Sequence, residues 1–371
     1  MKKQECCCYQ DLWQNHRRRQ NEQNESTDDT LADDEIDVSS DVFFQLANAP
    51  LVSYRLPSTL IGAKKNENAR DSEIPLHRPT EIVIEQDVEG AAQKHTGGIV
   101  WETAYLLLEY LLCQLKSNVG IDDSAIDNGK PNVFSFLQRK DSKRSTSIVE
   151  VGAGCGMLGL TLHRALELAV NQNSVEGNKP CTVILTETNE VMDNLRRNFH
   201  RNCPTENDDN ISPSCDSSSP PAVSVFELDW TSYQEHCQDA GMNAHSVDLI
   251  LGTDVVFSTR FVEPLLQTME YLCHENGMAI LCLQERCPDS HALLLDKANK
   301  YGFVIEDISE RVFDDYSCCR FGMDLDCKLL QFTRESLNKA KKENKRKTPK
   351  KLKKTKRSES KDKKPRLQEI T

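Results

Sequence analysis

The chain has 371 residues, enough for one large domain or two small ones, and 38% of them are hydrophobic, so part of the chain is expected to be disordered while the rest buries a core. The formal net charge is -12, although residues 339–366 hold 16 Lys and Arg against three acidic residues. Without that basic segment the net charge is near -25, which argues against a nucleic-acid-binding core.

The cysteines and the amino-terminal composition predict a compartment. The 15 cysteines include no CxxC pair, and the first 30 residues are polar, without the apolar stretch of a secretory signal. No apolar run approaches the ~18 residues that a membrane-spanning helix needs. We therefore expect reduced thiols in a cytoplasmic or nuclear protein, with no membrane span and no metal site.

The composition divides the chain into four segments. They are a disordered acidic arm (1–40), an amino-terminal extension (41–95), a main domain (96–334) and a disordered lysine-rich tail (335–371). Within the extension, residues 51–54 and 81–84 are candidate short strands, which we expect to fold against the main domain. Two polar inserts in the main domain, residues 117–144 and 203–221, are expected to be surface loops.

The main domain alternates short apolar runs with segments of helical periodicity. The expected strands are residues 146–151, 182–185, 223–228, 247–251, 278–283, 303–308 and 329–332. The expected helices are residues 104–115, 157–170, 191–199, 260–273 and 290–301. Seven strands with helices between most of them indicate an α/β fold with a doubly wound, Rossmann-like sheet.

A glycine-rich turn follows the first of these strands. The run Glu150-Val-Gly-Ala-Gly-Cys-Gly156 opens a helix, and ligands of such sheets bind where the strands end. Its GxGxG spacing differs from the GxGxxG of dinucleotide-binding folds. Glycines let the backbone approach a ligand closely, although a tight turn before a helix also favours them. The turn is therefore a candidate cofactor loop.

The ends of the second and third strands carry two further candidates. Glu187 lies 37 residues after Glu150, and its carboxylate can accept hydrogen bonds from both ribose hydroxyls. The alternative for Glu187 is a place in the first turn of a helix, which the helix dipole favours. Trp230 offers a flat apolar ring suited to an adenine face, with a core tryptophan as the alternative.

These motifs together resemble the family-16 protein methyltransferases, the methyltransferase-like twenty-one type of lysine methyltransferases. The likeness covers roughly residues 80–334 and rests on Thr96-Gly-Gly-Ile-Val-Trp-Glu102, Glu150-Val-Gly-Ala-Gly-Cys-Gly-Met-Leu-Gly159, Leu228-Asp-Trp230 and Gly252-Thr-Asp-Val-Val-Phe257. Many methyltransferases share the glycine loop, whereas its combination with GxVWE and DxxF is fairly specific. Position 187 carries Glu where close relatives usually have Asp, and position 257 carries Phe where Tyr is common.

The resemblance implies S-adenosylmethionine as the cofactor and a lysine side chain of a protein as the methyl acceptor. It also implies a role for each matching residue. Trp101 would pack near the methionine end, Gly152, Ala153 and Gly154 would cradle that end, Glu187 would hold the ribose, Trp230 would flank the adenine, and Thr253 would line the pocket.

Asp254 and Phe257 follow the fourth strand and are the expected catalytic residues. A lysine must lose its proton before it can attack a methyl group, and a nearby carboxylate favours the charged form instead. We therefore expect Asp254 to bind and aim the amine, and Phe257 to wall the channel and offer a π-face to the cation. A cap of the following helix is the alternative for Asp254. Glu285 fits the same crevice and a surface pair with Arg286 equally well.

The partners of the chain follow partly from the tail. The lysine-rich segment resembles a nuclear address or a nucleic-acid-contacting arm, with a solvated tail of no role as the alternative. Nothing in the sequence demands more than a monomer. Three other functions stay open: methylation of histidine or arginine, a binding module without catalysis, and an NAD-dependent dehydrogenase. The GxGxG spacing and Trp230 argue against the dehydrogenase.

Overall fold

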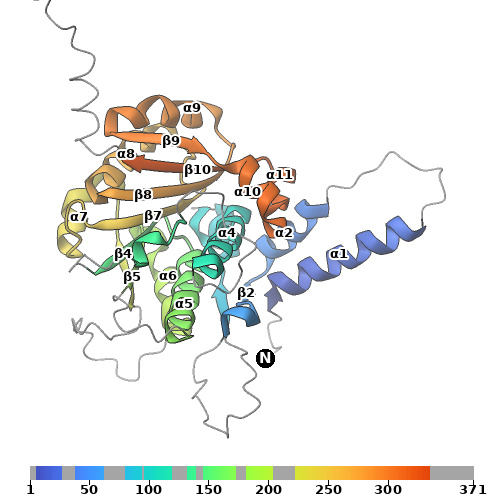
Figure 1. Ribbon diagram of the computed structural model, residues 1–371. Helices are drawn as coiled ribbons and strands as arrows, with labels where there is room; N and C mark the ends of the chain where they lie inside the picture. Colours follow the sequence, from blue (N-terminus) through green and yellow to red (C-terminus); the bar gives the residue numbers. More distant parts are fainter. Residues whose placement is uncertain are drawn as a thin grey trace, which may run out of the picture. The chain divides into compact units, whose positions relative to one another are not determined.

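The computed structural model describes residues 6–26, 38–61, 80–93, 96–118, 132–138, 145–172, 181–203 and 222–334. A seven-stranded sheet of order β6-β5-β4-β7-β8-β10-β9 forms its centre (Figure 1). The strands are β4 (Thr146–Val151), β5 (Cys181–Glu187), β6 (Ala222–Glu227), β7 (Val247–Thr253), β8 (Cys273–Gln284), β9 (Phe303–Asp307) and β10 (Cys327–Arg334). Only β10 runs antiparallel to its two neighbours. The expected doubly wound α/β sheet is confirmed.

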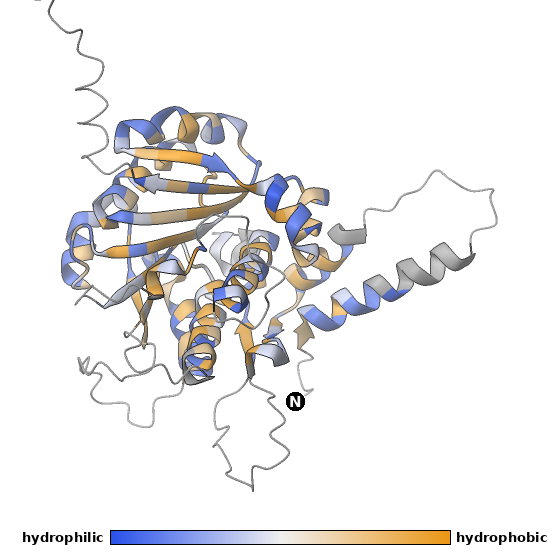
Figure 2. Ribbon diagram, in the orientation of Figure 1, coloured by the Kyte–Doolittle hydropathy of each residue, from blue (hydrophilic) through white to orange (hydrophobic). Residues whose placement is uncertain are grey.

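Helices cover both faces of this sheet, because its central strands are apolar on both sides. One face packs against α4 (Glu102–Asn118), α5 (Met157–Gln172), α6 (Asn189–Asn202), α10 (Ser309–Asp315) and α11 (Phe321–Asp324). The other face packs against α7 (Tyr233–Asp239), α8 (Thr259–Leu272) and α9 (Pro288–Lys297). Alternate residues of one strand enter the two cores: Ile148 faces the first and Val149 the second. Figure 2 shows the hydrophobic residues gathered along these strands.

The amino-terminal extension forms a second sheet of order β1-β2-β3. Its strands are β1 (Cys7–Cys8), β2 (Leu51–Arg55) and β3 (Glu81–Glu85), and β2 and β3 pair antiparallel. The candidate strands 51–54 and 81–84 are thus present as β2 and β3. The helices of this part are α1 (Tyr9–Ser26), α2 (Val38–Asn48) and α3 (Val88–Gln93), with 3-10 turns at Ser58–Ile61 and Thr96–Gly98.

The described residues near the amino terminus depart from the disorder expected there. Tyr9 is buried, and its ring stacks on Tyr54 at 5.6 Å and on Tyr105 at 4.7 Å between centroids. Trp13 meets the ring of Phe321 edge-on at 5.3 Å. Two aromatic residues therefore attach α1 to the core, although the average composition of the segment is polar.

The first polar insert also contributes to the core. Within residues 132–138, Val133, Phe134 and Phe136 are buried, next to a 3-10 turn at Ser135–Gln138. This short apolar run departs from the surface loop expected over residues 117–144, because burying three apolar side chains outweighs the polar flanks. Residues 204–221 of the second insert and the tail 335–371 lie outside the described residues.

Two expected features concern the thiols and the membrane. Each of the 14 cysteines in the described part of the chain is a free thiol. Across those same residues, the helices are too short or too polar for any of them to span a bilayer.

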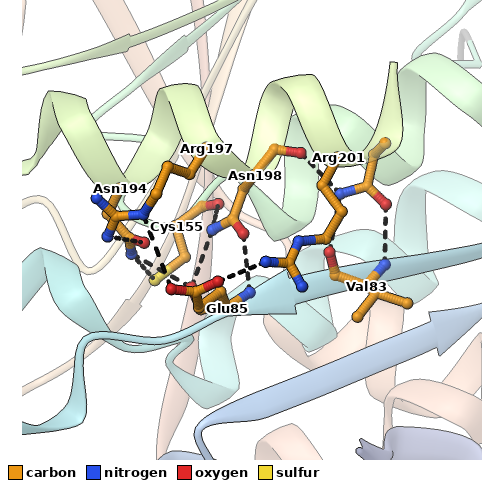
Figure 3. Close-up of polar contacts among 8 residues, drawn as sticks. Val83, Glu85, Cys155, Asn194, Arg197, Asn198 and Arg201 are labelled. Atoms are coloured by element: carbon orange, nitrogen blue, oxygen red, sulfur yellow. Dashed lines mark hydrogen bonds and ion pairs between the residues drawn. The ribbon is translucent and has the colours of Figure 1, made fainter. Parts of the chain in front are cut away.

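Asparagines on one face of α6 hold the backbone of β3 (Figure 3). Asn202 accepts from the Val83 N–H at 2.9 Å and donates to the Val83 carbonyl at 2.8 Å. Asn198, one helical turn earlier, accepts from the Glu85 N–H at 2.8 Å and donates to the Glu85 carbonyl at 2.9 Å. Each amide therefore satisfies one donor and one acceptor of the strand.

The same face of α6 reaches the glycine-rich turn. Asn198 donates to the Cys155 carbonyl at 3.0 Å, and Asn194 donates to the Cys155 sulfur at 3.5 Å. Arg197 and Arg201 add ion pairs to the Glu85 carboxylate (Figure 3). The extension, α6 and the glycine-rich turn are thus tied through a few side chains.

Replacing Asn198 with Ala is expected to lower the free energy of unfolding by about 3 kcal/mol, because the Glu85 N–H and the Cys155 carbonyl lose the partner that this buried side chain supplies. The Glu85 carbonyl keeps a second donor, Asn194, at 3.3 Å. Urea unfolding followed by circular dichroism measures the loss. Asn189→Ala is the control, since Asn189 is exposed at the start of the same helix. Equal losses for the two variants would contradict the role given to Asn198.

Candidate functional site

A cavity of about 520 Å³ lies where β4, β5 and β7 end, the usual ligand position in open α/β sheets. The structure brings every residue predicted from the sequence to this one cavity. Its lining includes Trp101, Gly152, Ala153, Gly154, Glu187, Trp230, Thr253, Asp254 and Phe257.

The glycine-rich turn forms one wall, and its backbone requires glycine. Gly152 has φ 66° and Gly154 has φ 54°, the left-handed region that side chains disfavour. A Cβ at Gly152 would lie 2.9 Å from a methyl group of Val255, and one at Gly154 would lie 3.2 Å from the Gly97 carbonyl oxygen. Bare backbone therefore faces the cavity at this turn.

Glu187 ends β5 and fixes the turn that it faces. Its Oε2 accepts from the Gly154 N–H at 2.8 Å, and its Oε1 accepts from the Thr188 N–H at 2.8 Å. A carboxylate has about four lone-pair sites, so hydrogen bonds from sugar hydroxyls remain possible. The carboxylate lines the cavity, and it also lies at the amino end of α6, where Thr188 is the N-cap.

Aromatic rings form the rim of the cavity. Trp230 meets Phe261 edge-on at 6.3 Å, and Phe261 lies 5.5 Å from Phe257, whose side chain is 51% exposed. Trp101 is fixed by a hydrogen bond from its Nε1 to the Thr96 carbonyl at 3.0 Å. Phe257 thus presents an exposed apolar ring in the lining of the cavity.

Asp254 is held rigidly just after β7. Its backbone has φ 50°, its N–H donates to the Cys282 carbonyl at 3.0 Å, and its Oδ1 accepts from the Gln284 N–H at 2.8 Å. Its Oδ2 is buried without a hydrogen-bond partner. Burial raises the pKa of Asp254 to about 6. The helix-cap alternative is not realised, since Ser258 stands at the amino end of α8.

Two charged residues beside Asp254 had no assigned role in the sequence. Arg286 Nη2 lies 2.7 Å from Glu102 Oε1 and 3.6 Å from Asp254 Oδ2. Glu102 is the last residue of the GxVWE motif, which was the only signal that could have indicated it. Glu285 is exposed, and the ion pairs of Arg286 are made with Glu102 and Asp254 instead.

Glu150, the first residue of the glycine motif, is a buried acid in the cavity wall. It is 1% exposed, and its Oε2 has no hydrogen-bond partner. Burial raises the pKa of Glu150 to about 8. Because the folded pKa exceeds the unfolded one, the folded state binds the extra proton, and stability is lost as the pH rises from ~4.5 to about 8.

Glu150→Gln is therefore expected to make unfolding of the ligand-free protein less sensitive to pH. The gain over the wild type should grow by about 3 kcal/mol between pH 5 and pH 8.5, because glutamine carries no ionisable group. Urea unfolding at the two pH values measures it. Glu227→Gln, at an exposed strand end, is the control. A gain of equal size at both pH values would contradict the assignment.

The groups that line the cavity fit S-adenosylmethionine, which carries a flat base, a hydroxylated sugar and a cationic amino-acid end. Trp230 offers a ring, Glu187 offers carboxylate oxygens, and the glycine turn offers backbone without side chains. The buried Oε2 of Glu150 has no hydrogen-bond partner, and an ammonium group placed beside it would favour the ionised carboxylate. Base, sugar and amino-acid end thus each find matching chemistry.

Comparisons with known proteins agree with this site. A family model described as "Lysine methyltransferase" matches residues 78–300, more than half of the chain. Protein-lysine methyltransferase METTL21E of Bos taurus is 25% identical over 219 residues, covering 59% of this chain and 53% of that protein. Protein N-lysine methyltransferase METTL21A of Danio rerio is 25% identical over 167 residues, covering 45% of this chain and 62% of that protein.

The matches span about half to three-fifths of the length of these curated relatives. The family match includes the GxVWE segment, the glycine-rich turn and the DxxF segment, so the resemblance expected from the sequence is confirmed. The chain belongs to the lysine methyltransferase family.

Proposed function

We propose that the chain is an S-adenosylmethionine-dependent protein N-methyltransferase whose acceptor is a lysine side chain of a protein. The observation that carries the proposal is Asp254, which lines the cavity and whose buried Oδ2 has no hydrogen-bond partner and lies 3.6 Å from the Arg286 guanidinium. A carboxylate oxygen beside aromatic rings is suited to an alkylammonium group. Membership of the lysine methyltransferase family supports the choice of acceptor.

Different residues of the cavity bind different parts of the cofactor. Glu187 holds the ribose hydroxyls, Trp230 flanks the adenine, and the backbone from Gly152 to Gly154 cradles the amino-acid end beside Trp101. Glu150 receives the ammonium of that end, and Thr253 lines the pocket. These roles are supported by the positions of the residues, because each residue lies in the wall of the same cavity.

The cofactor supplies an electrophilic methyl group on a sulfonium, and the chain's residues bring the amine to it. Asp254 aims the amine, because the Gln284 N–H holds its Oδ1 while the Cys282 carbonyl holds its backbone N–H. With its pKa at about 6, Asp254 is too weak a base to deprotonate a lysine of reference pKa ~10.4, so the proton leaves to solvent. Phe257 and Phe261 limit access of water to the bound amine.

Labelled S-adenosylmethionine and a methylation-depleted lysate test the proposal, with mass spectrometry to locate the mark. The expected result is label on a lysine that Asp254→Asn does not produce. Label on histidine or arginine would keep the reaction and overturn the acceptor. A protein that binds S-adenosylhomocysteine but transfers no label would instead be a binding module.

We propose further that the chain is a monomer in the cytoplasm or nucleus and that its tail contacts nucleic acid. The compartment is supported by the free thiols of the described residues. Gel filtration of the purified protein tests the monomer. The 16 basic residues within 339–366 support the contact, which should weaken steeply as salt is raised. A filter-binding series with RNA at increasing salt measures this dependence.

A further inference from the structure

Arg286 occupies an environment suited to a bound cation. Its Nη2 lies 2.7 Å from Glu102 Oε1 and 3.6 Å from Asp254 Oδ2, and its guanidinium carbon lies 4.1 Å from the centre of the Trp101 ring. The side chains of Glu102 and Asp254 are only 13% and 12% exposed. Two shielded carboxylates and one indole face are the groups that bind alkylammonium ions.

The same atoms belong to the place proposed for the acceptor amine. Asp254 and Trp101 line the cavity, and Asp254 Oδ2 is the oxygen assigned to the amine. Two positive charges placed at this oxygen would repel each other strongly, because the surroundings are shielded from water. The acceptor ammonium and the Arg286 guanidinium therefore compete for one position.

The guanidinium group of Arg286 can leave the two carboxylates when another cation binds there. Its side chain is 38% exposed, and it lies just beyond the end of β8, where its N–H donates to the Gln284 carbonyl at 2.8 Å. That backbone bond does not depend on where the guanidinium lies. The side chain can therefore leave the carboxylates for solvent without disturbing the sheet.

We propose that Arg286 Nη2 marks the binding position of the acceptor's ammonium group, and that Arg286 is a gate which the substrate lysine displaces. This inference rests on the proposed lysine methylation. Glu102 then becomes, with Asp254, the second carboxylate that receives the ammonium group. Trp101, as the floor of this subsite, would face both the cofactor and the acceptor.

The gate gives the site a preference among acceptors. A lysine ammonium arrives with a full positive charge and can replace the guanidinium at both carboxylates. A histidine is mostly neutral above its reference pKa of ~6.5, so it gains little from the two carboxylates and does not displace Arg286. The displaced ion pair is a cost of binding the acceptor, and it should appear in KM rather than in kcat.

The first test measures binding alone, with n-butylammonium as a probe of the lysine side chain. Ligand-observed NMR on the S-adenosylhomocysteine complex is expected to show about 10-fold tighter binding to Arg286→Gln than to wild type. The additional change Glu102→Gln should abolish the gain, and n-butanol should bind all forms equally weakly. Arg260→Gln is the matched control, because Arg260 lines the cavity and lies over Phe261 at 4.3 Å. An equal gain in both arginine variants would overturn the gate, since net charge alone would explain it.

The second test follows methyl transfer to a peptide library with a central lysine. Arg286→Gln is expected to lower KM for the peptides about 5-fold or more, with kcat within about twofold of wild type. A fall in kcat at constant KM would overturn the gate, because Arg286 would then position Asp254. Tighter n-butylammonium binding without any transfer by either protein would sustain the subsite and sink the proposed function. Transfer by both proteins, with no change in KM or probe binding, would do the reverse.

Discussion

Replacing Asp254 with Asn is expected to lower kcat for methyl transfer by about 100-fold or more, while S-adenosylhomocysteine binding stays near the wild-type value. The amide keeps an oxygen for the Gln284 N–H but cannot balance the charge of a bound ammonium group. Single-turnover transfer to lysine peptides measures the loss, and calorimetric titration measures the binding.

Asp326→Asn is the matched control for this variant. Asp254 and Asp326 share a φ of 50°, a backbone conformation that asparagine also tolerates, but Asp326 is exposed and outside the cavity. A variant at Asp254 that keeps more than about a tenth of the control's activity would contradict its assigned role.

The dependence of kcat/KM on pH should reflect the ionisation of the Asp254 carboxylate. Asp254 must be ionised to bind a cation, and its pKa is raised to about 6, so kcat/KM should fall as the pH drops below about 6. An unshifted aspartate would place this limb near ~4 instead. A profile that stays flat down to pH 5 would show that the ionised form is not required.

Replacing Gly152 with Ala is expected to weaken S-adenosylhomocysteine binding by about 100-fold. The new Cβ would combine a left-handed backbone with a 2.9 Å approach to Val255, and it would stand 3.5 Å from the Trp230 ring in the cavity wall. Isothermal titration measures the dissociation constant. The cavity wall must move to accommodate the added methyl group before the ligand can bind, so the substitution should raise the dissociation constant.

Gly241→Ala separates this effect from backbone strain. Gly241 has the same φ of 66°, but a Cβ there would meet nothing within 4 Å. The control should lose about 1 kcal/mol of stability and keep its affinity for the ligand. Equal ligand affinities in the two variants would contradict the role of the Gly152 backbone in holding the cofactor.

Much of the main sheet could be predicted because local patterns determine where parallel strands begin and end. The strand expected at 146–151 is present with the same bounds, and each motif residue chosen at a strand end lines the cavity. Strand direction was not accessible in this way. The apolar run of β10 has the same pattern whether it lies parallel or antiparallel, and tertiary contacts place it between β8 and β9.

The residues of the site that could not be predicted from the sequence depend on contacts between positions far apart in the chain. Arg286 and Glu102 are 184 positions apart, and only the fold brings them to Asp254. The attachment of α1 was missed because Tyr9 and Trp13 are diluted in a polar segment, and average composition does not register two well-placed rings. The asparagines of α6 likewise follow the spacing of a solvent-exposed helix face.

The asparagines of α6 also occupy the edge of β3 that could otherwise pair with a strand of another molecule. One helical turn of four residues advances ~6 Å, and two strand residues advance ~6.8 Å, so amides at every fourth position match alternate peptide groups of a strand. Asn198 and Asn202 thus act toward Glu85 and Val83 as a neighbouring strand would. An unpaired strand edge is a template for intermolecular β-pairing, and here side chains already fill that template. Variants that shorten these amides would expose β3 to self-association as well as loosen the fold.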